Sequence, residues 1–288
     1  MKTVEEILKA SAAFLEKKQV GRSRRLAEDL LAHIFGQKRI DLYLQYDRPL
    51  IDEELAQMRD GVKRLSQGEP LQYILGELEF YGCRIKTDRR ALIPRQETEL
   101  LVDLIVKRKP KGVVWDLCAG SGCIGIAPKK KIPELTVVMS DVSKDALSLA
   151  EENVKINEVD VSLRQGDLLE PLREEKADVV VCNPPYVTAD EYETIDPSVR
   201  DFEPKLALVG GESGLVFYQR LQAELPFLLK KGGQLFLEIG ANQGAAIKEI
   251  FSTPVWEGQE LLQDWSGRDR FFFTLKSNNF LDYDGGLN

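Results

Sequence analysis

The sequence predicts an α/β fold, in which a mostly parallel sheet covered by helices follows a smaller helical bundle. From residue 112 onward, short runs of buried-type residues alternate with stretches of helical length and period, an alternation typical of parallel sheets. Before residue 70 the apolar residues recur at helical spacing instead. Two polar loops also follow strand candidates, which puts both at the sheet edge where ligands bind in such folds.

The first part of the chain, residues 1–70, is expected to form the helical bundle. Its last helix has Asp52 as a plausible N-cap and Gly68 at its end. A linker of residues 71–95 follows. Loose alternation of apolar residues from Gln72 to Asp88 predicts a β-hairpin within it.

Residues 96–277 are expected to form the sheet domain, and residues 278–288 a poorly ordered tail. A helix should begin near Glu97 and lead into the first strand. The strand candidates are Gly112–Leu117, Leu135–Ser140, Val161–Gln165, Asp178–Cys182, Gln234–Ile239 and Arg270–Leu275. The intervening helical stretches are Ser143–Asn157 and Gly214–Leu229.

Composition excludes several classes of protein. With 43% hydrophobic and 30% charged residues, the chain reads as an ordinary globular protein. It has no run of about 18 apolar residues and no secretory signal at its start, so we expect a cytoplasmic protein that does not span a membrane. The net charge of −8 makes nucleic acid an improbable partner. One histidine and four cysteines without metal-type spacing predict no metal site.

The first polar loop, DLCAGSG at residues 116–122, joins the first strand to a helix. Glycines at this place let the backbone approach a ligand closely. The loop lacks the lysine of a P-loop and the full dinucleotide spacing. Pro128 falls in the helix that follows and should kink or shorten it. The candidate cofactor-binding residues here are Asp116, Cys118, Ala119, Gly120, Ser121 and Gly122.

The second and third strands end in acids. Asp141 stands about 20 residues after the turn, where a carboxylate commonly accepts hydrogen bonds from ribose hydroxyls. Asp167 and Leu168 follow the third strand, near the expected position of an adenine edge. The alternative is a tight turn with ordinary surface acids, but the joint placement favours a nucleoside site.

The second polar loop, NPPY, ends the fourth strand (VVVC). Its prolines fix the backbone and hold the Asn183 side chain and the Pro184 carbonyl in one geometry. Two such acceptors suit a planar NH2 group, and Tyr186 can supply a flat face against it. The candidate catalytic residues are therefore Asn183, Pro184, Pro185 and Tyr186, with Asn183 also at the cofactor. A proline turn that merely ends a strand is the alternative.

Both loops resemble those of the Rossmann-like class I S-adenosylmethionine-dependent methyltransferases, and NPPY is similar to the motif of their amino-methylating branch. Further segments resemble the release factor glutamine methyltransferase family. They are GEPLQYILG (68–76), LIPRQETE (92–99), Glu203-Pro204 with Ala207-Leu208, EIG (238–240) and GRDR (267–270).

That resemblance implies S-adenosyl-L-methionine as cofactor and class I peptide chain release factors as substrate. The methyl acceptor would be the N5 amide nitrogen of the glutamine in their Gly-Gly-Gln loop, with residues 1–70 docking the substrate. Two departures stand out. Gln96-Glu97 replace the family's usual Pro-Asp, and Cys118 replaces a glycine that many members carry.

Two other functions fit parts of the pattern. NPPY also serves nucleic-acid amino methyltransferases acting on adenine N6 or guanine N2, but these need a large basic recognition segment that this acidic chain lacks. A non-catalytic binding module with a vestigial cofactor fold is the second, and the intact loops argue against it.

Overall fold

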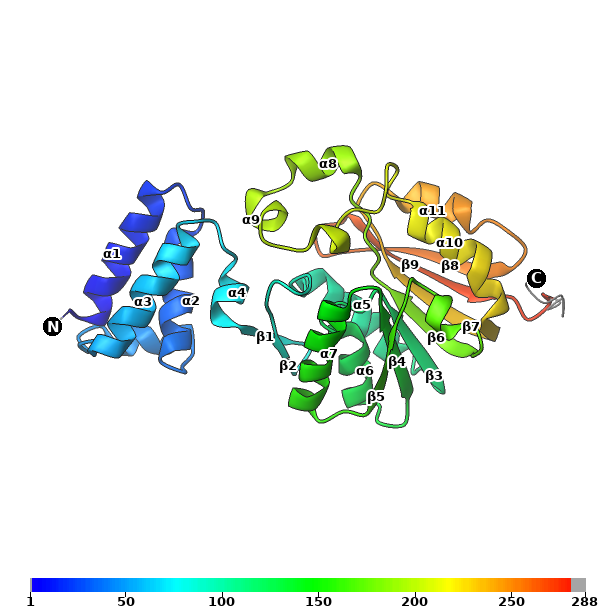
Figure 1. Ribbon diagram of the computed structural model, residues 1–288, viewed down its shortest axis with the longest axis horizontal. Coiled ribbons are helices and arrows are strands. Elements are labelled where there is room, and N and C mark those ends of the chain that lie inside the picture. The colour runs from blue at the N-terminus through cyan, green and yellow to red at the C-terminus, as the bar shows by residue number, and fades with distance from the viewer. Residues whose placement is uncertain (1, 281–288) are drawn as a thin grey trace. The chain divides into compact units, whose positions relative to one another are not determined.

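The computed structural model describes residues 2–280, which divide into two compact units (Figure 1). One unit runs up to Glu77 and also includes Asp196–Phe202, whereas the other comprises Leu78–Ile195 and continues from Glu203. The last residues of the expected tail, 281–288, lie outside the described residues. None of the helices within residues 2–280 combines the length and apolar composition needed to cross a bilayer.

The first unit is a helical bundle around its own apolar core. Each of its longer helices is amphipathic, with one apolar and one polar face. Leu8, Leu31 and Leu65 are among the side chains buried between the helices. Its elements are α1 (Val4–Lys17), α2 (Ser23–Ile34), the 3-10 helix η1 (Arg39–Gln45), α3 (Asp52–Leu65), α4 (Leu71–Leu75) and the short α9 (Pro197–Arg200).

The start of α3 and the start of the linker differ from the sequence expectations. Asp52 is the first helical residue of α3, and Ile51 is the N-cap, with its amide donating to Glu54 Oε2 at 3.0 Å. The linker begins with helix α4, for which Pro70 is the N-cap residue. The helix ends at Gly76, whose φ is +78°. The hairpin is therefore shorter than expected. Its strands are β1 (Glu77–Phe80) and β2 (Cys83–Lys86).

The second unit contains a seven-stranded sheet in the order β5-β4-β3-β6-β7-β9-β8. The first five strands of this order run parallel, and β9 and β8 are antiparallel additions at one edge. The strands are β3 (Val113–Leu117), β4 (Thr136–Asp141), β5 (Val161–Gln165), β6 (Ala177–Cys182), β7 (Leu229–Glu238), β8 (Trp256–Gln263) and β9 (Asp269–Lys276).

Helices cover both faces of the sheet, as the strand–helix alternation predicts (Figure 1). Alternate residues of each strand point to opposite faces, so Val114 packs under one layer and Trp115 under the other. The helices are α5 (Gln96–Lys107), α6 (Cys123–Lys131) and α7 (Lys144–Asn157) with one core cluster, and α10 (Val216–Glu224) and α11 (Gly244–Ile250) with the other.

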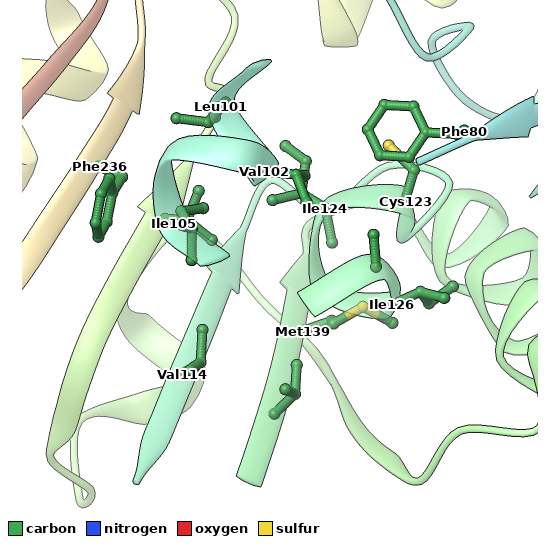
Figure 2. Packing of buried hydrophobic residues seen from close by; sticks show 14 of the residues in the cluster. Phe80, Leu101, Val102, Ile105, Val114, Cys123, Ile124, Ile126, Met139 and Phe236 are labelled. Atoms are coloured by element: carbon green, nitrogen blue, oxygen red, sulfur yellow. The ribbon is translucent and has the colours of Figure 1, made fainter. Parts of the chain in front are cut away.

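Figure 2 shows the first of these core layers at close range. Ile105 of α5 and Ile124 of α6 lie in one apolar cluster with Val114 of β3 and Met139 of β4. Pro128 lies within α6, which ends soon afterwards at Lys131. This packing fixes the carboxyl ends of β3 and β4, from which the loops of the candidate site begin.

β8 has no counterpart among the strand candidates from sequence. Its residues include a glycine, two glutamates and two glutamines, which weaken the apolar alternation that identifies a strand. Pairing with β9 stabilises it at the sheet edge.

Candidate active site

The glycine-containing turn after β3 has left-handed backbone at three positions. φ is +56° at Cys118, +56° at Gly120 and +80° at Gly122. A Cβ at Gly122 would lie 3.0 Å from the Cε of Met139, so this position needs glycine for space as well as for conformation. Cys118 occupies its left-handed conformation at a cost of roughly 1–2 kcal/mol, which a glycine at this position would not incur.

Asp141 holds this turn in place from the end of β4. Its Oδ2 accepts the Gly120 amide at 2.8 Å, and its Oδ1 accepts the Ser143 amide at 2.8 Å. Burial raises the pKa of Asp141, and the hydrogen bonds from Ser143 and Gly120 oppose that shift. Each carboxylate oxygen has a second lone pair, so the side chain can still accept hydroxyl hydrogen bonds.

Asp116 lies beneath the turn rather than in the wall of the cavity. The side chain is fully buried, and its Oδ2 accepts the Gly125 amide at 2.8 Å. Burial raises the pKa of Asp116 to about 8. Its Oδ1 has no hydrogen-bond partner among the described residues. Asp116 thus supports the start of α6 from below.

Asp167 and Leu168 also line the cavity. Leu168 also has a left-handed φ of +52°, which turns the chain sharply after β5. The Asp167 carboxylate receives two bonds from the guanidinium of Arg220, at 3.0 and 2.9 Å. This fork joins the loop after β5 to helix α10.

The NPPY loop follows β6 directly. Asn183 and Pro185 line the cavity, whereas Pro184 and Tyr186 do not. The Asn183 side chain makes no hydrogen bond to any residue within 2–280. Burial raises the pKa of Tyr186 to about 12, so its hydroxyl stays protonated at neutral pH.

The cavity has a volume of about 350 Å³ and lies along the carboxyl ends of the parallel strands. It brings together Cys118 to Ser121, Asp141, Asp167, Leu168, Asn183 and Pro185 from the predicted set. Gly122, Asp116, Pro184 and Tyr186 stand behind or beside its wall. Predicted residues from four separate loops therefore converge on one space.

Sequence reasoning did not assign two segments that complete this wall, residues 90–95 and 204–207. Glu203 ties them together, because its carboxylate accepts the Ile93 amide at 2.9 Å and the Arg95 guanidinium at 2.6 Å. The motifs LIPRQETE and Glu203-Pro204 were visible in the sequence, but no periodicity indicated that they face each other. Phe217 and Arg220 of α10 were missed for the same reason.

A buried acid ends β7, the strand beside β6. The Oε2 of Glu238 accepts the hydroxyl of Thr98 at 2.7 Å, and Thr98 lines the cavity. Burial raises the pKa of Glu238 to about 7, against the lowering effects of the Thr98 hydrogen bond and of Arg270.

Within residues 2–280, no three or more His, Cys, Asp or Glu side chains are grouped so that they could hold a metal ion. The four cysteines are free thiols. The polar groups that line the cavity include amides, hydroxyls, carboxylates and three arginine side chains.

The fold and the arrangement of loops define a class I methyltransferase. The profile of the methyltransferase small domain matches residues 95–225. A crystal structure of a methyltransferase from Pyrococcus furiosus shares this fold, with a TM-score of 0.53, 17% identity, and coverage of 79% of this chain and 100% of that one.

Two sequence relatives and a second profile narrow the class. The release factor glutamine methyltransferase of Geobacter sulfurreducens is 38% identical over 269 residues, which cover 93% of this chain and 95% of the relative. That of Chlamydia trachomatis serovar D is 38% identical over 281 residues, covering 96% and 95%. The profile of the PrmC N-terminal domain matches residues 6–76. The chain belongs to the release factor glutamine methyltransferase family.

Proposed function

We propose that this protein transfers a methyl group from S-adenosylmethionine to the side-chain amide nitrogen of the glutamine in the Gly-Gly-Gln loop of class I peptide chain release factors. The observation that carries this function is the unpartnered Asn183 amide at the wall of the cavity, beside the glycine-containing turn. Asn183 is half-buried, and a side-chain amide that lines a cavity without a protein partner is available to a ligand.

The bare backbone at Gly120 supports a cofactor site in this cavity. A Cβ at Gly120 would face the Cβ of Ala91 at 3.9 Å, and both residues line the cavity. A side chain at this position would therefore project into the space, whereas bare backbone leaves room for a ligand. S-adenosylmethionine supplies an electrophilic methyl group on a sulfonium centre.

Each part of the wall has a proposed task. The backbone of Cys118 to Ser121 would lie along the methionine moiety, and Asp141 would accept hydrogen bonds from the ribose. Asp167 and Leu168 would border the adenine. Because Arg220 already holds the Asp167 carboxylate, we assign the adenine contact to the Leu168 side chain and to the backbone of this loop.

The NPPY loop would grip the glutamine amide. An amide nitrogen is a poor nucleophile because its lone pair is delocalised into the carbonyl. Acceptance of its two hydrogens by Asn183 and by the Pro184 carbonyl would orient the nitrogen toward the methyl group. Such orientation can supply much of the rate enhancement by itself. Tyr186, placed just behind the wall, would support this geometry.

The first unit would select the substrate. A glutamine side chain occurs in most proteins, so selection of one glutamine requires contacts beyond the cavity. We assign this docking to residues 1–70, with 71–95 as the linker and 96–277 as the catalytic part. Since release factors work on ribosomes, we place the protein in the cytoplasm.

A methyl-transfer assay with labelled S-adenosylmethionine tests the function against its alternative. We expect label in purified release factor and none in transfer RNA, ribosomal RNA or DNA. Label in nucleic acid with none in release factor would overturn the proposal in favour of a nucleic-acid amino methyltransferase.

A further inference from the structure

Gln243 makes three side-chain hydrogen bonds, one of which is to the NPPY loop. Its Nε2 donates to the carbonyl oxygen of Tyr186 at 3.1 Å and to that of Gly214 at 3.2 Å. Its Oε1 accepts the amide of Gly240 at 2.9 Å. A side-chain amide has two donor hydrogens and one carbonyl oxygen, so both of its donors and its acceptor group are engaged.

The position of Gln243 in the fold explains what these bonds connect. Gln243 is the N-cap residue of α11, just after the carboxyl end of β7. β7 pairs with β6 in parallel, with Leu237 opposite Cys182. Gln243 therefore joins the loops that follow two neighbouring strands at the edge of the sheet where the cavity lies.

One peptide group of the NPPY loop is held at both ends. The Tyr186 carbonyl accepts from Gln243, and the Val187 amide of the same peptide group donates to the Leu208 carbonyl at 2.9 Å. The Tyr186 side chain is held less closely, since its hydroxyl lies 3.4 Å from Nη1 of Arg270. The backbone, more than the ring, is what fixes this end of the motif.

Two glycines pack directly on backbone carbonyls of the NPPY loop. A Cβ at Gly210 would lie 2.3 Å from the Pro185 oxygen, and a Cβ at Gly214 would lie 2.3 Å from the Tyr186 oxygen. Both contacts are to backbone, which cannot move aside as a flexible side chain can. Residues 210–214 thus press against the loop, and the Gln243 amide bonds the two segments together.

We infer that Gln243 is a positioning residue for methyl transfer, which holds the Pro185-Tyr186 end of the NPPY loop so that Asn183 and Pro184 keep their geometry. This inference rests on the proposed function of that loop. Gln243 lines no part of the cavity, so it acts through the loop and not on the cofactor. A displacement of about 1 Å at a reacting group can cost on the order of 100-fold in rate.

The substitution Gln243→Glu tests this role. It keeps an acceptor for Gly240 but turns a carboxylate oxygen toward the carbonyls of Tyr186 and Gly214. Gln259→Glu is the matched control, because Gln259 is also part-buried and its Nε2 donates to a backbone carbonyl, that of Phe251, at 2.7 Å. This control lies on β8, at the edge of the sheet away from β6.

Three measurements are compared between the variants. We expect Gln243→Glu to lower turnover at saturating substrates by about 10-fold or more and to leave the Kd for S-adenosylmethionine within about 3-fold. Hydrogen exchange of the Val187 amide should become about 10-fold faster or more, whereas Gln259→Glu should change none of these. The exchange measurement does not depend on activity, so it remains informative if the proposed function fails.

Several outcomes would overturn the inference. Val187 exchange as slow as in the control would show that Gln243 does not hold the loop. Loss of cofactor affinity in parallel with turnover would show a general structural role. If Gln243→Glu does not fold, the same three quantities are measured on Gln243→Met. This uncharged variant also removes the donor, and its results then decide whether the inference stands.

Discussion

At the scale of single residues, the polar side chains of the site differ in whether they already have a hydrogen-bond partner in the protein. Asp141 and Asp167 both have their carboxylates engaged by protein donors. The Asn183 side chain, at the cavity wall, has no partner within residues 2–280. Under the proposed function, the hydrogen-bonded carboxylates would form a rigid part of the cofactor site. The Asn183 side chain would be free to bind the substrate amide in the transition state.

Replacement of Asn183 by alanine should separate binding from catalysis. We expect the Kd for S-adenosylmethionine to change little, while turnover falls by a factor on the order of 100, because the amide loses an acceptor that orients it. Calorimetric titration and single-turnover methylation of release factor measure the two quantities. Asn242→Ala, at an exposed position, is the control, and survival of turnover within a few-fold in Asn183→Ala would refute the proposed role of NPPY.

Replacement of Asp141 by alanine should act on the cofactor instead. We expect S-adenosylmethionine binding to weaken by roughly 1.5–3 kcal/mol, because the ribose loses a charged acceptor and the Gly120 amide loses its partner. Calorimetry on Asp141→Ala and on Asp160→Ala, an exposed acid, makes the comparison. Equal affinities in the two variants would mean that Asp141 does not contact the cofactor.

Sequence alone could indicate most of these residues, because glycines, prolines and acids at strand ends carry a local signal. It could not tell which carboxylates face the cavity. Asp116 and Asp141 both follow the pattern, yet Asp116 is fully buried under the turn while Asp141 lines the cavity. That difference depends on the packing of α6 against β3 and β4, which no local pattern contains.

At the scale of elements, the carboxyl ends of the parallel strands could be predicted and the segments that close the cavity could not. The strand candidates led to the loops after β3, β4, β5 and β6, since strand and turn signals are local. Residues 90–95 are bonded to Glu203, which directly precedes residues 204–207 and lies more than a hundred residues from Ile93. Contacts of this kind arise from tertiary packing.

The buried acid at the end of β7 should give the protein a measurable pH dependence. The pKa of Glu238 is raised from 4.5 to about 7, so the folded state binds a proton that the unfolded state releases. The contribution to the free energy of unfolding is therefore fully present below about pH 4.5 and is lost as the pH rises through about 7. Its size is up to about 3 kcal/mol.

Denaturant unfolding at pH 5 and pH 8 tests this dependence. We expect the free energy of unfolding of the unmodified protein to fall more between these pH values than that of Glu238→Gln, which cannot ionise and can still accept from Thr98. Glu257→Gln, an exposed position on β8, should behave like the unmodified protein. Identical pH dependence in all three proteins would contradict the raised pKa.

At the scale of the whole molecule, the proposed division of labour assigns docking to the helical unit. Several of its basic residues are paired internally. Arg24 bonds the buried Glu28 at 2.5 Å, so its replacement would disturb the bundle. Arg25 is a cleaner choice, because its side chain is 64% exposed and lies 3.5 Å from Asp29.

Charge reversal at Arg25 should affect only a large substrate. We expect Arg25→Glu to raise KM for intact release factor several-fold, because complementary charge steers association, and to leave methylation of a short Gly-Gly-Gln peptide unchanged. Arg173→Glu is the matched control, since Arg173 is 57% exposed and lies 3.6 Å from Glu224 in the other unit. Equal kinetics of the two variants on intact release factor would contradict docking through this surface.

The most direct test of the central claim is tandem mass spectrometry of purified release factor after incubation with this protein and S-adenosylmethionine. We expect a single added methyl group on the glutamine of the Gly-Gly-Gln loop, and no methyl group on a release factor in which that glutamine is replaced by alanine. A methyl group on any other residue, or none on release factor while the protein binds S-adenosylmethionine, would contradict it.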